Sequence, residues 1–314
     1  NHEAVKIYQD GKLVGTDRLT TGTQPASFRN DRLFLGARTG FVAPLHGWLD
    51  EVKIEKVSSY VNDVANHADL VGYWRLGESA GTTAWEVKGT VGNGTYLNTT
   101  ASDYSQPAAV NYDLDTAMQF NGVNSYVNAG NHTSLNGDWD GLTVAAWIKP
   151  ENGALSGVTM IAGKWANSVS QDHFALLMVN GRVGIAVADG EMGENAMLSQ
   201  ATLLPDEWYF VAGTWDATTR SYSVYINGEL DPATGTQYGN GINLLSTTTM
   251  KIGAQVVGQP RYFAGLIDEV AVFNTALGGE ELMAYYRTAM VPEPSGVLLV
   301  LVGLLGLLGR RRRR

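Results

Sequence analysis

Residues 265–273 read GLIDEVAVF and contain two neighbouring carboxylates. Carboxylates are side chains that can act as acids and bases in catalysis. Cleaving a glycosidic bond needs two carboxyl groups on one face, about 5 to 10 Å apart, one as acid and the other as base or nucleophile. The segment has the pattern of a strand, in which adjacent side chains point to opposite faces. Asp268 and Glu269 are adjacent, so we expect them not to act as a catalytic pair.

Aromatic side chains in loops are the second candidate chemistry, because an exposed ring can stack on the face of a sugar. Such a site also needs Asn or Asp side chains beside the ring. Four aromatic residues lie in loop-like stretches and are candidate ligand contacts: Trp139, Trp165, Tyr238 and Tyr262. Four tryptophans lie within predicted strands and are expected in the core: Trp74, Trp147, Trp208 and Trp215. Core packing is the alternative for each of the first four as well.

Other reactive patterns are missing from the sequence. There are no cysteines, which excludes disulfides, thiolate metal sites and thiol nucleophiles. The five histidines are scattered, and no serine nucleophile elbow, phosphate-binding glycine loop or His-x-x-x-His pattern occurs. The formal net charge is -9, and the chain without its five C-terminal arginines is more acidic still. An acidic chain lacks the basic surface that nucleic-acid binding requires, so we expect no nucleic-acid partner.

Short strands joined by turns must position these residues. The chain has 37 Gly, 14 Tyr and 8 Trp, which favours a β-rich fold with many turns. Strand patterns recur between residues 71 and 273 at intervals of about 10 to 15 residues, as in an antiparallel β-sandwich. Residues 280–288 read EELMAYYRT and predict a helix, with Leu282 and Tyr285 on the apolar face that caps the sandwich.

The sequence also repeats itself at an offset of 217 residues. Residues 7–13 (IYQDGKL) match 224–230 (VYINGEL), and residues 47–52 (GWLDEV) match 265–270 (GLIDEV) at an offset of 218. We therefore expect three parts. Residues 1–57 are the C-terminal part of a first, truncated copy, 58–70 are a linker or a short helical turn, and 71–288 are a complete second copy. The first copy would start before Asn1, so we expect the sequence to be a fragment or a processed chain.

Residues 289–314 differ in kind from the rest. The stretch Pro292-Glu293-Pro294 is followed by residues 296–309, which are all Gly, Val or Leu. This apolar run is shorter than the roughly 20 residues of an ordinary transmembrane helix. The chain closes with a topology signal that favours a cytoplasmic basic end: Arg310, Arg311, Arg312, Arg313 and Arg314. We expect contact with a membrane through a short apolar helix at 296–309.

Six motifs follow one another through the second copy. They are VGYWRLGE at 71–78, MQFNG at 118–122, LTVAAWIKP at 142–150, WYFVAGTWD at 208–216, YINGEL at 225–230 and GLIDEVAVF at 265–273. In type and order they resemble the laminin-G-like, concanavalin-type jelly roll, over about 70% of the chain. The resemblance implies an all-β fold, an antiparallel jelly-roll β-sandwich. It leaves function open, because one fold hosts many functions.

The tail is similar to the PEP-CTERM sorting signal of bacterial envelope proteins. That resemblance implies an exosortase-type membrane enzyme, which would recognise Pro292, Glu293 and Pro294 and remove the tail. The protein would then be exported, anchored in the membrane before processing, and found afterwards at the cell surface or in the extracellular matrix. A plain C-terminal membrane anchor is the alternative.

The jelly-roll resemblance also bears on metal and catalytic sites. Jelly rolls of this type often hold a calcium ion with carboxylate and carbonyl oxygens. Asp268 is the first candidate ligand, with Asn121 and Glu78 on segments that could approach it. The alternative is that Asp268 accepts hydrogen bonds from a neighbouring loop. Glycoside hydrolases of this fold carry Glu-x-Asp-x-x-Glu, and the nearest match, ELDPAT at 229–234, lacks the third carboxylate. We therefore expect no enzymatic activity.

These observations predict a non-catalytic binding or adhesion module on a bacterial surface, with a glycan or a protein as ligand. Two alternatives stay open. The jelly rolls could be structural spacers of a surface protein, or accessory modules of a larger enzyme whose catalytic part lies upstream.

Overall fold

The structure is a computed structural model. It describes residues 4–9, 12–18, 60–110, 115–137, 139–166, 172–188, 194–232, 246–255 and 260–290. The chain divides into two compact units, residues 1–57 with 292–314, and residues 58–291. In the first unit β1 (Ala4–Gln9) pairs with β2 (Lys12–Arg18), and Gln9 lies opposite Lys12. In the second unit Ile226 of β15 lies opposite Glu229 of β16, which is the same register 217 positions later. The repeated sequence therefore forms the same hairpin in both places.

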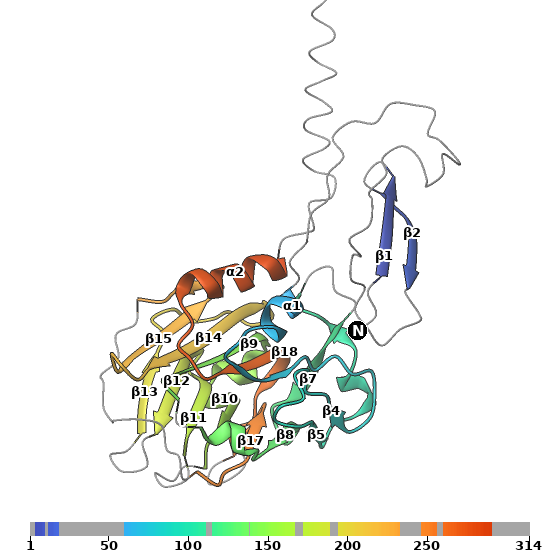
Figure 1. The fold of residues 1–314 in the computed structure, drawn as a ribbon. Helices are drawn as coiled ribbons and strands as arrows, with labels where there is room; N and C mark the ends of the chain where they lie inside the picture. The colour runs from blue at the N-terminus through green and yellow to red at the C-terminus, as the bar shows by residue number, and fades with distance from the viewer. Residues whose placement is uncertain are drawn as a thin grey trace, which may run out of the picture. The chain divides into compact units, whose positions relative to one another are not determined.

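Two antiparallel sheets make up the described part of the second unit (Figure 1). Sheet I has the order β16 (Glu229–Leu230), β15 (Ser221–Ile226), β14 (Tyr209–Asp216), β9 (Gly141–Pro150), β18 (Ala264–Phe273), β7 (Thr116–Asn121) and β6 (Gln106–Pro107). In addition, β3 (Leu70–Trp74) pairs with β18. Sheet II has the order β13 (Glu194–Leu198), β12 (Arg182–Ala188), β11 (Phe174–Val179), β10 (Val158–Lys164), β17 (Met250–Ile252), β8 (Tyr126–Gly130), β5 (Gly94–Leu97) and β4 (Thr83–Ala84). The predicted all-β sandwich is confirmed.

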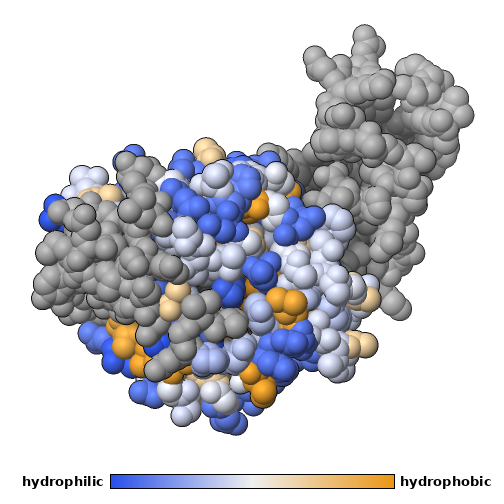
Figure 2. All heavy atoms as spheres, turned by 90° about the horizontal axis from the view of Figure 1, so that it is seen from below, coloured by the Kyte–Doolittle hydropathy of each residue, from blue (hydrophilic) through white to orange (hydrophobic). Residues whose placement is uncertain are grey.

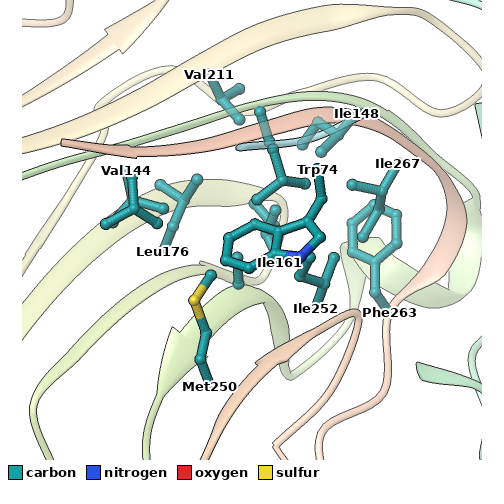
Figure 3. Close-up of a cluster of buried hydrophobic side chains, with 14 of the residues drawn as sticks. Trp74, Val144, Ile148, Ile161, Leu176, Val211, Met250, Ile252, Phe263 and Ile267 are labelled. Atoms are coloured by element: carbon teal, nitrogen blue, oxygen red, sulfur yellow. The ribbon is translucent and has the colours of Figure 1, made fainter. Parts of the chain in front are cut away.

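Side chains that alternate along the strands fill the space between the two sheets. In β9, Val144 and Ile148 face this core, whereas Trp147 faces away from it. Figure 3 shows the ring of Trp74 in the core, close to Ile148 of sheet I and Ile252 of sheet II. Trp74 has no exposed surface. Burial of large apolar side chains on both sheets is what holds them face to face.

Two helices cover the outer face of sheet I. The predicted C-terminal helix is confirmed as α2 (Gly279–Met290), which buries Leu282 and Tyr285. A second helix, α1 (Tyr60–Ala65), buries Tyr60, whose ring packs edge-on against that of Tyr285. Residues 60–65 thus form the short helical turn that was the alternative to a linker at 58–70, and their apolar side chains belong to the core of this unit. Among the described residues, three short 3₁₀ helices lie at Ala101–Asp103, Thr133–Asn136 and Asn152–Leu155.

Candidate functional site

Among the tryptophans that the structure describes, Trp85 alone is exposed, with 62% of its surface accessible. It directly follows β4, in which Thr83 is half-buried and Ala84 is buried in the core. Alternation along the chain therefore places Thr83 and Trp85 on the outer face of sheet II. A tryptophan is seldom this exposed, because burying so large an apolar ring is strongly favourable.

Hydrogen bonds fix the backbone on both sides of this ring. The N–H of Trp85 donates to Oε1 of Glu78 at 2.8 Å, and the N–H of Glu86 donates to Oδ1 of Asn93 at 3.0 Å. Glu78 is itself held by the hydroxyl of the buried Tyr96, which donates to Oε2 at 2.5 Å. Burial and the charge of Glu78 raise the pKa of Tyr96, so this hydroxyl stays a donor.

A second anchor comes from the carboxylate of Glu86, which is buried. Its Oε1 accepts the N–H groups of Tyr73 and Lys88, and its Oε2 accepts the N–H of Thr90. Loop 85–93 is thus tied to β3 through one side chain. The ring of Trp85 is exposed, and the backbone that carries it is held in place, which lowers the entropy lost when a ligand orders this loop.

A row of polar side chains extends from the ring across sheet II, at the end where β4, β5, β8 and β17 lie side by side (Figure 1). Thr83 lies opposite Thr95, Thr95 lies opposite Asn128, and Asn128 lies opposite Lys251. The residues that flank them in the same strands are buried, so all four side chains point to the outer face. We call Trp85 and this row the platform.

Part of the unit that carries the platform matches a known family, from residue 121 onward, which includes Asn128 and Lys251 but not Trp85. Residues 121–283 match the model of the concanavalin A-like lectin/glucanases superfamily, and this match covers just over half of the chain. The chain belongs to that superfamily. A search of curated proteins found no match.

Several solved structures of other proteins share the fold. The receptor-binding domain of a botulinum neurotoxin C/D mosaic is 16% identical, with a TM-score of 0.51 over 70% of this chain and 51% of the toxin chain. Botulinum neurotoxin type C, whose cell entry depends on two ganglioside molecules, is 14% identical, with a TM-score of 0.52 over 74% and 53%. Domain 4 of an extracellular arabinanase of Geobacillus stearothermophilus, in complex with arabinotriose, is 17% identical, with a TM-score of 0.50 over 69% and 98%. The chain thus spans about half the length of the toxin chains, and these likenesses show the fold.

The expectation that the side chains of Asp268 and Glu269 point to opposite faces of their sheet is wrong. Asp268 lies opposite Trp147 and Ala271 lies opposite Ala145, so β18 has one residue more than β9 between these pairs. This β-bulge is made by Glu269, whose φ of 55° lies in the left-handed region. Both carboxylates therefore lie on the outer side of sheet I, beneath the helices.

Each carboxylate of the bulge is fully buried. Glu269 accepts hydrogen bonds from Nε and Nη2 of Arg75 at 3.0 and 2.9 Å, and one from the hydroxyl of Tyr73. Asp268 accepts the N–H of Ala109 at 3.0 Å, as the alternative to calcium binding predicts, and its Oδ1 is buried without a hydrogen-bond partner. Burial raises the pKa of Asp268 well above its usual range, and the neighbouring charge of Glu269 raises it further.

The three predicted calcium ligands do not converge. Asn121 lies opposite Ala264, four residues along β18 from Asp268, which is about 13 Å at the rise of a strand. Its Oδ1 instead accepts the N–H groups of residues 123, 124 and 125 and shapes a turn. Both carboxylate oxygens of Glu78 serve the platform. Within the described residues, no group of three or more His, Asp or Glu side chains is placed to hold a metal ion. Calcium binding stays a prediction.

The predicted aromatic ligand contacts have different outcomes. Trp139 and Trp165 are buried, with 8% and 4% of their surfaces exposed, so the expectation of exposed rings is wrong for both. Trp139 packs against His173 and Phe174 although no strand contains it. Tyr262 is half-buried and lies 6.5 Å from the ring of Tyr126, near the platform strand β8. Tyr238 lies outside the described residues.

The tail that was predicted from 289–314 lies outside the described residues from 291 onward, including the sorting motif, the apolar run and the arginines. Among the helices that are described, none has the length and apolar character needed to cross a membrane.

Proposed function

We propose that the concanavalin A-like module is a non-catalytic glycan-binding domain and that the platform is its binding surface. One observation carries this proposal. The ring of Trp85 is exposed on a backbone held by hydrogen bonds, and it stands beside a row of hydroxyl and amide groups on the outer face of sheet II. A sugar needs this combination, an apolar face for its C–H groups and hydrogen-bonding groups for its hydroxyls.

The fold relatives support a glycan as the ligand. Domain 4 of the arabinanase is in complex with arabinotriose, and cell entry of the type C toxin depends on gangliosides. On the face that Figure 2 shows, hydrophobic side chains of the described residues form separate patches among hydrophilic ones. Such a surface fits a polar ligand better than a large protein interface.

The positions of the carboxylates argue against catalysis. The eight described strands of sheet II contain a single acidic residue, Glu194, whereas a glycoside hydrolase needs two. Asp268 and Glu269 are buried beneath helices, where no glycan reaches them. Asp231, in the segment nearest to the hydrolase motif, accepts the N–H groups of Gln200 and Ala201 and so fixes a loop.

A glycan array with the full chain tests the proposal, followed by titration calorimetry on the best ligand. Trp85→Ala should weaken binding by about tenfold or more, because stacking on one aromatic ring contributes about 1 to 3 kcal/mol in comparable sites. Leu230→Ala is the matched control, since Leu230 is exposed to 60% on the opposite sheet. Equal affinities of the Trp85→Ala variant and the unmodified chain would exclude the platform as the site.

We also propose that the protein is exported and sorted through its tail. The order of Pro292-Glu293-Pro294, the apolar run and the arginines supports this. In a host that has an exosortase-type enzyme, the mature protein should lack the tail, and a Glu293→Ala substitution should leave the tail attached. Intact mass measurement distinguishes the two forms. Retention of the tail in the unmodified protein would favour a plain membrane anchor.

A further inference from the structure

We infer that the platform selects an acidic oligosaccharide, with a sugar ring on Trp85 and a carboxylate of the same glycan at the ammonium group of Lys251. This inference rests on the proposed function and names the class of glycan. The observation that favours an acidic glycan over a neutral one is that Lys251 is buried and forms no ion pair within the described residues. Lys251 lies at the end of the platform that is far from the ring of Trp85.

Lys251 is a cation that is almost removed from water and has no anion beside it. Only 6% of its surface is exposed. Its Nζ donates to Oγ1 of Thr249 at 2.8 Å and to the carbonyl oxygen of the same residue at 3.4 Å, both of which are uncharged. No Asp or Glu in the described part of the chain forms an ion pair with it. Burying a charge is costly unless it is paired. A carboxylate arriving on this face would therefore gain a charge-assisted hydrogen bond from a group that is already desolvated.

A second buried lysine shows that Lys251 is a special case. Lys164 is also buried, but its side chain points into the sandwich, where its Nζ bonds to Oδ1 of both Asn131 and Asn136. That lysine ties a loop to β10 on the inner side of the sheet. Lys251 instead lies opposite Asn128 on the outer face, and Gly163 opposite it on the other neighbouring strand has no side chain to cover it.

The spacing of the two ends requires an oligosaccharide. Trp85 follows β4 and Lys251 is in β17, which are three strand spacings apart in sheet II. At about 4.8 Å per spacing this is about 14 Å, more than one sugar ring spans. Thr95 and Asn128 lie between the ends and are placed to bond the hydroxyls of the intervening sugars.

The attraction has to be local. The net charge of the chain is -9, so the protein as a whole repels anions. A nearly buried lysine is screened little by salt, so the preference for the acidic glycan should persist at moderate ionic strength.

The test compares an oligosaccharide containing a hexuronic acid with the same oligosaccharide after reduction of its carboxyl group to an alcohol. A sulfated form of the neutral oligosaccharide is a third ligand. Calorimetry with the full chain should give about tenfold tighter binding of the carboxylated form than of the reduced form. Lys251→Gln should remove this preference, so that the variant binds the carboxylated and the reduced form with the same affinity. Lys251→Arg should retain the preference, and Lys149→Gln on sheet I is the control for a general loss of charge.

The outcomes separate this inference from the proposed function. A loss of affinity of about tenfold or more for every ligand in Trp85→Ala, together with loss of the carboxylate preference in Lys251→Gln, supports both. Equal binding of the carboxylated and reduced forms by the unmodified chain overturns the acidic preference and leaves glycan binding in place. Binding of the sulfated form with the same dependence on Lys251 supports an anion site that accepts either group. Absence of binding to all three ligands counts against both.

Discussion

The folded protein should lose stability as pH rises, because the carboxyl group of Asp268 ionises while it is buried in the bulge. An Asp268→Asn substitution should remove this pH dependence. Asp268 and Glu269 are fully buried side by side, and Arg75 bonds to Glu269 and also to Asp115. Within the described residues, Asp268 receives only the N–H of Ala109, and one of its oxygens has no hydrogen-bond partner. Its ionised form is therefore poorly stabilised in the folded state, and Asn can keep the bond from Ala109 without carrying a charge.

The sign follows from the direction of the pKa shift. Burial raises the pKa of Asp268 in the folded protein, so the folded state holds a proton that the unfolded state has already released. The folded state is thus favoured at acidic pH and loses this advantage as pH rises from the ordinary pKa of Asp to the raised one. One proton changes the free energy of unfolding by at most about 1.4 kcal/mol per pH unit. Between pH 5 and 7 the difference between the variant and the unmodified chain should grow by up to about 2.7 kcal/mol.

Urea unfolding at pH 5, 6, 7 and 8 measures this difference. The free energy of unfolding of the Asp268→Asn variant should increase relative to that of the unmodified chain at each pH step. The free energy of unfolding of an Asp206→Asn control should change with pH in the same way as that of the unmodified chain. Asp206 suits this purpose because it is exposed and its φ of 61° is one that Asn also adopts. Parallel curves for Asp268→Asn and the unmodified chain would refute the argument, since they would show that Asp268 binds no extra proton on folding.

Three further predictions concern the platform and the core. Glu78→Ala should weaken glycan binding without removing a ligand contact, because the backbone of Trp85 loses its acceptor, and calorimetry should show a less favourable entropy. Glu86→Ala should lower the free energy of unfolding by about 1 to 3 kcal/mol in urea titrations, because the N–H of Tyr73 is left buried without a partner. Trp74→Ala should cost about 3 to 5 kcal/mol in the same assay, since the ring fills the space between the sheets.

The strands and α2 were predictable because their side chains repeat with a period that burial enforces. In β9 every second residue faces the core, and in α2 Leu282 and Tyr285 share one side. The bulge at Glu269 leaves no such trace. A single non-glycine residue in the left-handed region shifts the alternation by one position, and only the pairing of β18 with β9 shows it.

The site was harder to predict than the fold because exposure is a property of the whole structure. Trp139 and Trp165 occur in loop-like sequence but are buried, whereas Trp85 follows a strand of two residues, too short for a clear pattern. The alternation of Thr83, Ala84 and Trp85 was the available signal. The pairing of Asn128 with Lys251 joins positions more than one hundred residues apart, which no local pattern contains.

Sheet I buries two carboxylates and sheet II buries the side chain of Lys251, and both features should make the protein sensitive to rising pH. On sheet I the bulge carboxylates are held in the interior, and rising pH weakens the fold there as they ionise. On sheet II burial lowers the pKa of Lys251, so rising pH also removes the charge that would hold an acidic glycan, at a lower pH than for an exposed lysine. Binding should therefore decline at alkaline pH for two separable reasons. In the Asp268→Asn variant the fold should resist the rise in pH while the preference for the acidic glycan still falls, which assigns the second effect to Lys251.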